Sequence, residues 1–296
     1  MQRGAAGGAK SSMVATELTA GRVDHAVIEL PPMRRAFTAV AATSLLAGHP
    51  AAAQQKPAAE PPAPTVVCAG GTQPHLAASA DGRFYVVFLR NGNIELAVST
   101  DQGKTFAAPV TAIDAKGHAR GGMQRGPRVA IDRRHTIYVT APLCFDAEEL
   151  GKRYPTNDLY LAVSTDGGQT FGAPARINDA PKQAPEALHW LAAAPGGEVF
   201  VAWLDRRQRK GPGQDLGYAV VGDRGKKISA NTVLQGPVCE CCAPGVAIDE
   251  NANPILVWRE GGDRKNRALW IATSADRGVT FTAQKRLNHD DSRVDG

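Results

Sequence analysis

An eight-residue pattern recurs along the chain and sets its organisation. Three copies begin at Ser99, Ser164 and Ser274, and all fit Ser-x-Asp-x-Gly-x-Thr-Phe. A degenerate copy at 221–228 keeps the Asp and the Gly but loses the Ser, the Thr and the aromatic residue. The Asp positions 101, 166, 223 and 276 are 65, 57 and 53 residues apart. A repeat of this length indicates an array of similar supersecondary units.

Each copy follows a short apolar segment that is typical of a β-strand, and a hairpin-like pair of segments lies ahead of it. The four single segments are 94–98, 159–163, 216–220 and 269–273. The four pairs are 74–78 with 84–89, 127–131 with 136–140, 187–192 with 199–204, and 244–248 with 255–258. We therefore expect four strands in each unit. Units of this size built from four strands are typical of the blades of a β-propeller, which must stack on their neighbours.

The octapeptide has the chemistry of a hairpin turn. An Asp side chain accepts hydrogen bonds from main-chain N–H groups two residues on, Gly allows a positive φ, and the aromatic residue packs into the sheet beyond the turn. We therefore expect Asp101, Asp166 and Asp276 to be structural rather than catalytic.

These octapeptides resemble the Asp-box of the sialidase, or bacterial neuraminidase repeat, propellers, and the resemblance covers roughly residues 66–290. The residues that carry it are Ser99, Asp101, Gly103, Phe106, Ser164, Asp166, Gly168, Phe171, Ser274, Asp276, Gly278 and Phe281. The resemblance implies an all-β fold, a β-propeller of the sialidase type. Such propellers have six blades and four are recognisable here, so we expect an incomplete six-bladed propeller. A small closed ring of four blades is the alternative.

The first 65 residues have the pattern of an exported protein. Residues 33–53 combine two arginines, a small and apolar stretch and an Ala-Ala-Ala cleavage site, which is typical of a secretory signal peptide. We interpret 1–53 as an extension plus this signal, with translation starting at Met33, 54–65 as a Pro/Ala-rich linker, and 66–296 as the propeller. A disordered extension ahead of a helix is the alternative for 1–53. Export predicts a periplasmic or secreted protein.

The composition excludes several classes of protein. The chain is 43% hydrophobic and 21% charged, which is typical of a globular protein. No apolar run approaches the ~20 residues that a membrane-spanning helix needs. The formal net charge is +5, and the one basic tract, 206–210, has no interleaved aromatic residues, so we expect no nucleic-acid partner.

Propeller geometry predicts which loops surround the ligand-binding mouth. The links between blades and the second turn of each blade lie at one face, whereas the octapeptides lie at the other. The mouth segments are 111–126, 178–186, 234–242 and 288–296, with 90–93, 143–157, 205–214 and 259–266. They supply the candidate ligand-binding residues Arg90, Arg120, Arg125, Arg206 and Arg259. Guanidinium groups bind carboxylate, sulfate or phosphate groups bidentately, although single arginines of this kind also occur in solvated loops.

The catalytic residues that the resemblance would imply are not all found. Sialidases carry an Arg-Ile-Pro motif, and the nearest string here is Arg125-Gly126-Pro127. No tyrosine follows Tyr218, so a late nucleophile is not assigned. Asp205 and Glu260 are weak catalytic candidates, and we expect them to pair with Arg206 or Arg259 instead. The favoured function is binding of a carbohydrate or another anionic ligand at the mouth; the alternative is an exo-α-sialidase or a related glycoside hydrolase.

Five cysteines leave an odd count for an exported protein: Cys68, Cys144, Cys239, Cys241 and Cys242. Structural disulfides are the first expectation, for example between Cys68 and the Cys-x-Cys-Cys cluster. Alternatively, the cluster holds a soft metal such as Cu(I) or exchanges disulfides. A periplasmic scaffold or metal/redox module is therefore a second alternative function. No other cofactor is expected.

Overall fold

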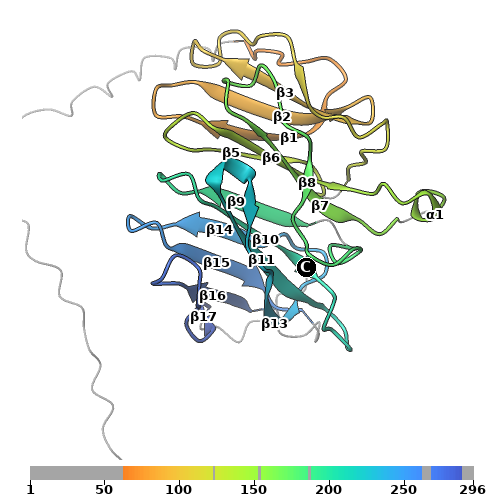
Figure 1. The fold of residues 1–296 in the computed structure, drawn as a ribbon, viewed down its shortest axis with the longest axis vertical. Helices are drawn as coiled ribbons and strands as arrows, with labels where there is room; N and C mark the ends of the chain where they lie inside the picture. The colour runs from red at the N-terminus through yellow and green to blue at the C-terminus, as the bar shows by residue number, and fades with distance from the viewer. Residues whose placement is uncertain (1–62, 123, 153–154, 186–187, 262–267, 289–296) are drawn as a thin grey trace, which may run out of the picture. The chain divides into compact units, whose positions relative to one another are not determined.

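The computed structural model of the chain describes residues 63–122, 124–152, 155–185, 188–261 and 268–288 (Figure 1). The chain divides into a unit of Met1–Glu60 and a unit of Pro61–Gly296, and all described residues belong to the second. The extension, the signal peptide, the start at Met33 and most of the 54–65 linker lie outside the described residues, and export stays a prediction. Within the described part, no helix is long and apolar enough to cross a membrane.

The described residues form four antiparallel sheets in which the strand order follows the chain, except that the fifth strand of the third sheet pairs with its third strand. The first sheet contains β1 (Thr72–Ala78), β2 (Phe84–Arg90), β3 (Asn93–Ser99) and β4 (Val110–Ile113); the second contains β5 (Arg128–Ile131), β6 (Ile137–Leu143), β7 (Asp158–Ser164) and β8 (Ala175–Arg176). The third contains β9 (His189–Ala193), β10 (Val199–Asp205), β11 (Gln214–Gly222), β12 (Lys227–Ile228) and β13 (Thr232–Val238); the fourth contains β14 (Gly245–Ile248), β15 (Pro254–Arg259), β16 (Leu269–Thr273) and β17 (Lys285–Arg286). The all-β fold and its four repeated units are confirmed.

The four sheets are arranged as the blades of a propeller. Their innermost strands lie side by side, β1 beside β5, β5 beside β9, and β9 beside β14. The sheets follow one another in chain order from β1–β4 to β14–β17 and do not close into a ring (Figure 1). The described residues therefore form an open, incomplete propeller and not the closed four-bladed ring.

The core lies between neighbouring sheets. All seven residues of β6 and all seven of β10 are buried, because the second and third sheets are covered on both faces. β1 instead alternates between exposed and half-buried positions, and Leu76 on its uncovered face is 55% exposed. The largely apolar sequences of β6 and β10 thus reflect the stacking of a neighbouring sheet on each face.

The third sheet corrects one prediction. Residues 234–242 were expected to link two blades, but Thr232–Val238 is strand β13, paired with β11. The physical reason is that β11 has nine residues, whereas β12 pairs only with Val221 and Gly222. β13 covers the rest of that edge, from Gln214 to Tyr218. The loop at 143–157 also contains a short helix, α1 (Ala147–Leu150), that the sequence did not predict.

The three octapeptides form the same hydrogen-bonded turn. At the first, Ser99 Oγ donates to Asp101 Oδ1 at 2.7 Å and accepts from the Gly103 N–H at 2.8 Å. Thr105 donates to the Asp101 carboxylate from its N–H at 2.9 Å and from its hydroxyl at 2.6 Å. Both patterns repeat in the copies at Ser164, Asp166, Gly168 and Thr170 and at Ser274, Asp276, Gly278 and Thr280.

This geometry corrects the expected turn chemistry in one detail. The main-chain donor to Asp101 was expected two residues on, but it is the N–H of Thr105, four residues on. Gly103, with φ +84°, turns the chain back so that Thr105 reaches the carboxylate. The aromatic residues Phe106, Phe171 and Phe281 are half-buried and pack against the apolar clusters, as expected.

We predict that replacing Gly278 by alanine costs more stability than the same change at Gly167. Both glycines have a positive φ, which alone costs an alanine about 1 kcal/mol. A Cβ at Gly167 meets no atom within 4 Å, whereas a Cβ at Gly278 overlaps the Tyr218 hydroxyl of the third sheet. Overpacking should raise the loss for Gly278→Ala to about 3 kcal/mol. Urea unfolding of both variants measures the difference, and equal losses would contradict the contact.

The octapeptide carboxylates should make stability fall in acid. Hydrogen bonds from the Thr and Ser side chains and from main-chain N–H groups lower the pKa of Asp101 and of Asp276 to about 2, from an ordinary 3.8. The unfolded chain therefore binds protons first, and the stabilisation present above about pH 4 is lost as pH falls towards 2. Thermal unfolding between pH 5 and 2 should show a shallower decline for Asp101→Asn than for the wild type. An equal decline in the variant and in the wild type would contradict the role of this carboxylate.

Candidate functional site

One face of the propeller is formed by the links between sheets and the second turn of each sheet; we call it the mouth face. The Ala119 N–H of the first link donates to the Gly92 carbonyl at 2.8 Å, which joins that link to the second turn of the first sheet. The Gly261 N–H, in the second turn of the fourth sheet, donates to the Pro237 carbonyl near the end of β13 at 3.0 Å. First turns and octapeptide turns lie at the opposite face, where Asp132, Glu198 and Arg224 line a pocket between the second and third sheets.

Three side chains from neighbouring innermost strands meet: His75 in the middle of β1, Arg128 at the start of β5 and Trp190 near the start of β9. We call them the axial cluster. The Arg128 guanidinium carbon lies 4.9 Å from the centroid of the Trp190 ring, and the His75 ring meets Trp190 edge-on at 5.2 Å. His75 Nδ1 accepts a hydrogen bond from the Val129 N–H at 3.1 Å. Innermost strands start at the mouth face, so Arg128 and Trp190 lie in the half of their strands nearer that face.

The guanidinium of Arg128 is buried, and the described groups that it contacts are two carbonyls and an aromatic ring. The residue is 7% exposed, and its Nη1 and Nη2 donate to the carbonyls of Pro127 and Gln124 at 3.2 and 3.0 Å. Its Nε has no hydrogen-bond partner, and no carboxylate pairs with it among the described residues. Burial lowers the pKa of Arg128, and burial together with the Arg128 charge lowers the pKa of His75 to about 4. His75 is therefore neutral at pH 7.

Sequence reasoning missed Arg128. It names Arg125, three residues earlier, because the expected mouth segment 111–126 ends just before the strand at 127–131. From the sequence, Arg128 belongs to the strand expected at 127–131. A charged residue at the start of a strand next to the propeller axis is the signal that could have identified it. Arg125 is half-buried and has an interaction partner in the structure.

The other predicted arginines have varied surroundings. Arg90 is paired with Glu95, its Nε donating to Oε2 at 2.7 Å, and this carboxylate raises the pKa of Arg90. Arg120 and Arg206 have exposed side chains. Arg259 donates to Cys242 Sγ at 3.6 Å, and that contact raises the pKa of Arg259.

The two candidate acids are both engaged. Asp205 is fully buried, and its Oδ2 accepts from Trp203 Nε1 at 3.0 Å. Its ion-pair partner is Arg207, which donates to both oxygens at 2.8 to 3.0 Å, and not Arg206 as expected. Arg206 points to solvent because the chain turns at the end of β10, whereas Arg207 folds back over the carboxylate. Glu260 accepts from Trp270 Nε1 at 3.2 Å.

Arg207 also joins two blades. It donates to Asp179 in the link that leaves the second sheet, and to Asn231 Oδ1 at 3.0 Å in the third sheet. Asn231 donates to the Ile177 carbonyl of that same link at 3.1 Å. Asp205 and Arg207 thus form an inter-blade joint.

This joint predicts unequal roles for two adjacent arginines. Arg207→Ala leaves the buried Asp205 charge unpaired and should lower the free energy of unfolding by about 3 kcal/mol. Arg206→Ala removes an exposed side chain and should cost less than about 0.5 kcal/mol. Guanidinium chloride unfolding of the two variants provides the comparison, and similar losses would argue against the joint.

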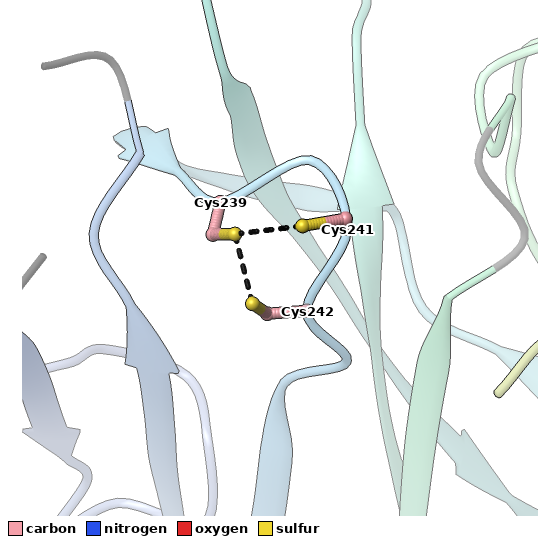
Figure 2. A group of neighbouring side chains, drawn as sticks. All are labelled: Cys239, Cys241 and Cys242. Carbon is pink, nitrogen blue, oxygen red and sulfur yellow. Dashed lines mark hydrogen bonds between the residues drawn. The ribbon is translucent and has the colours of Figure 1, made fainter. Parts of the chain in front are cut away.

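No disulfide bond joins any of Cys68, Cys144, Cys239, Cys241 and Cys242 in the structure. Cys68 precedes the first sheet and Cys144 follows β6, whereas Cys239, Cys241 and Cys242 lie together in the link before the fourth sheet (Figure 2). The pairing suggested between Cys68 and the cluster is accordingly not formed. The sulfur atoms of the three clustered cysteines lie within 4.8 Å of one another.

Solved sialidase structures share this fold. The Hadza microbial sialidase Hz136 aligns with a TM-score of 0.51 and 20% sequence identity over 73% of this chain and 46% of its own. The intramolecular trans-sialidase from Ruminococcus gnavus, solved with oseltamivir carboxylate, aligns with a TM-score of 0.50 and 12% identity over 74% of this chain and 71% of its own. This chain thus spans about half the length of the first of these proteins, at 46%. No protein-family model and no curated protein matches the sequence.

At these identities the likeness shows the fold alone. Together with the four stacked sheets, it defines the chain as a propeller of the sialidase type.

Proposed function

We propose that this chain binds a carbohydrate or another small ligand with a carboxylate at the mouth face, with Arg128 as the main contact. The observation that carries the proposal is a buried guanidinium without a carboxylate partner among the described residues. Burying a charge is costly unless it is paired, and the cation–π contact with Trp190 compensates only part of that cost. A ligand carboxylate would supply the missing charge in a bidentate pair.

The surroundings of Arg128 support a sugar acid. Trp190 is half-buried and packs against both the His75 ring and the Arg128 guanidinium. Aromatic side chains beside a few polar groups are typical of ligand sites. The fold is shared with sialidases, and one of those structures was solved with oseltamivir carboxylate, a carboxylate ligand. N-acetylneuraminic acid is therefore the first compound to test.

Binding is favoured over hydrolysis. Glycoside hydrolysis generally needs two carboxyl groups flanking the scissile bond, or an equivalent nucleophile. Asp205 is fully buried with Trp203 and Arg207 on its oxygens, and Glu260 accepts from Trp270. An exo-α-sialidase or a related glycoside hydrolase remains the alternative.

We predict that Arg128→Met weakens binding of N-acetylneuraminic acid to the full-length chain at least about tenfold. Methionine keeps an apolar stem against Trp190 but removes a charged hydrogen-bond donor, whose loss costs about 1.5–3 kcal/mol. Isothermal titration calorimetry measures the affinity, and near-UV circular dichroism checks the fold. Arg134→Met, on the opposite face, is the matched control and should bind like the wild type.

Two comparisons decide the ligand class and the reaction. Galactose, which has no carboxylate, should bind more weakly than N-acetylneuraminic acid. Equal affinities, or an Arg128→Met variant that is folded and binds normally, would refute the proposed site. Release of the fluorophore from a 4-methylumbelliferyl sialoside by the wild type would favour the enzyme instead.

A further inference from the structure

The link between the third and fourth sheets holds three cysteines in a tight turn. The turn begins where β13 ends, and the Cys239 N–H donates to the Arg259 carbonyl at 2.9 Å. It closes on itself through the Cys242 N–H, which donates to the Cys239 carbonyl at 3.4 Å. A four-residue turn brings its first and last residues close together. The fourth sheet therefore anchors the turn and fixes where its side chains lie.

The three sulfur atoms converge on one point. Cys239 Sγ lies 2.8 Å from Cys242 Sγ and 3.4 Å from Cys241 Sγ, and Figure 2 shows both neighbours turned towards it. All three separations are within 4.8 Å. Metal–thiolate bonds of about 2.3 Å place two sulfurs that share an ion at most about 4.6 Å apart. Three sulfurs that share one ion equally would lie about 4 Å apart, so Cys239 Sγ and Cys242 Sγ would move apart by about 1 Å on binding.

Access and charge also fit a metal ion. Cys239 is buried, Cys242 is half-buried and Cys241 is exposed, so the group is open to solvent on one side. Arg259 Nη1 donates to Cys242 Sγ at 3.6 Å. A guanidinium beside sulfur stabilises the negative charge that a metal-binding thiolate carries.

We propose that Cys239, Cys241 and Cys242 bind one Cu(I) ion as three thiolate ligands. Three soft donors select a soft ion such as Cu(I). Structural zinc sites almost always have four ligands, and no fourth Cys, His, Asp or Glu joins this group among the described residues. This site is separate from the axial cluster, and it goes beyond the proposed ligand binding because it gives the same chain a metal-binding role.

The test is an anaerobic titration of the reduced, full-length chain with Cu(I) in competition with bathocuproine disulfonate. One Cu(I) per chain should be withheld from the chelator, and X-ray absorption should show sulfur-only coordination by three atoms. Cys239→Ser, Cys241→Ser and Cys242→Ser should each weaken binding at least about 100-fold, since even outer-shell changes cost 10–100-fold. Cys144→Ser and Cys68→Ser are the matched controls and should leave the affinity unchanged.

Three results would overturn the proposal. The first is a disulfide between Cys239 and Cys242 that mass spectrometry still finds in the reduced protein. The second is Cu(I) binding that none of the three cluster variants weakens. The third is displacement of bound Cu(I) by one equivalent of Zn(II). Circular dichroism verifies that each variant folds, and sialic acid titrations of the same variants separate a failure here from a failure of the axial cluster.

Discussion

Burial of both faces of the middle sheets is the constraint on which the remaining structure depends. A four-stranded sheet from this chain has two apolar faces, and only a neighbouring sheet on each side removes them from water. Trp203 shows how closely this is met: its indole is fully buried in β10, and any side chain at Gly217, the opposite residue in β11, would collide with it. The same closeness holds between sheets, where a Cβ at Gly278 of the fourth sheet would overlap the Tyr218 hydroxyl of the third.

Both candidate sites follow from that stacking, but in different ways. The axial cluster exists because β1, β5 and β9 lie side by side, so that residues from three repeats meet near the axis. The edge of β5 even satisfies one of its N–H groups through His75 instead of through another strand. The thiol cluster belongs to one turn, and the fourth sheet contributes its anchoring contacts and Arg259.

The thiol cluster is local in the sequence and the axial cluster is not, and this difference explains which features the sequence predicts. The octapeptide spacing predicts the four sheets, and the cysteine cluster is visible because its members are three residues apart or closer. Arg128 could not be identified in this way, since its importance depends on Trp190, which comes 62 positions later in the chain. β13 was missed because Gly236 and Pro237 make it read as a loop, while the unpaired edge of β11 that requires it is a tertiary feature. Asp205 was paired with the wrong arginine for a similar reason, because local spacing does not show which side chain folds back.

The partners of each arginine indicate whether it stabilises the fold or is placed to bind a ligand. Arg90 has Glu95, and Arg207 has Asp205 and Asp179, so both charges are neutralised within the fold. Arg128 is more buried than either, yet it rests on an aromatic ring and two carbonyls. His75, beside it, is kept neutral by burial and by this same charge, which lowers its pKa. An arriving carboxylate would therefore pair with Arg128 and offset its charge at His75, whereas burial, the larger cause of the lowered His75 pKa, would remain.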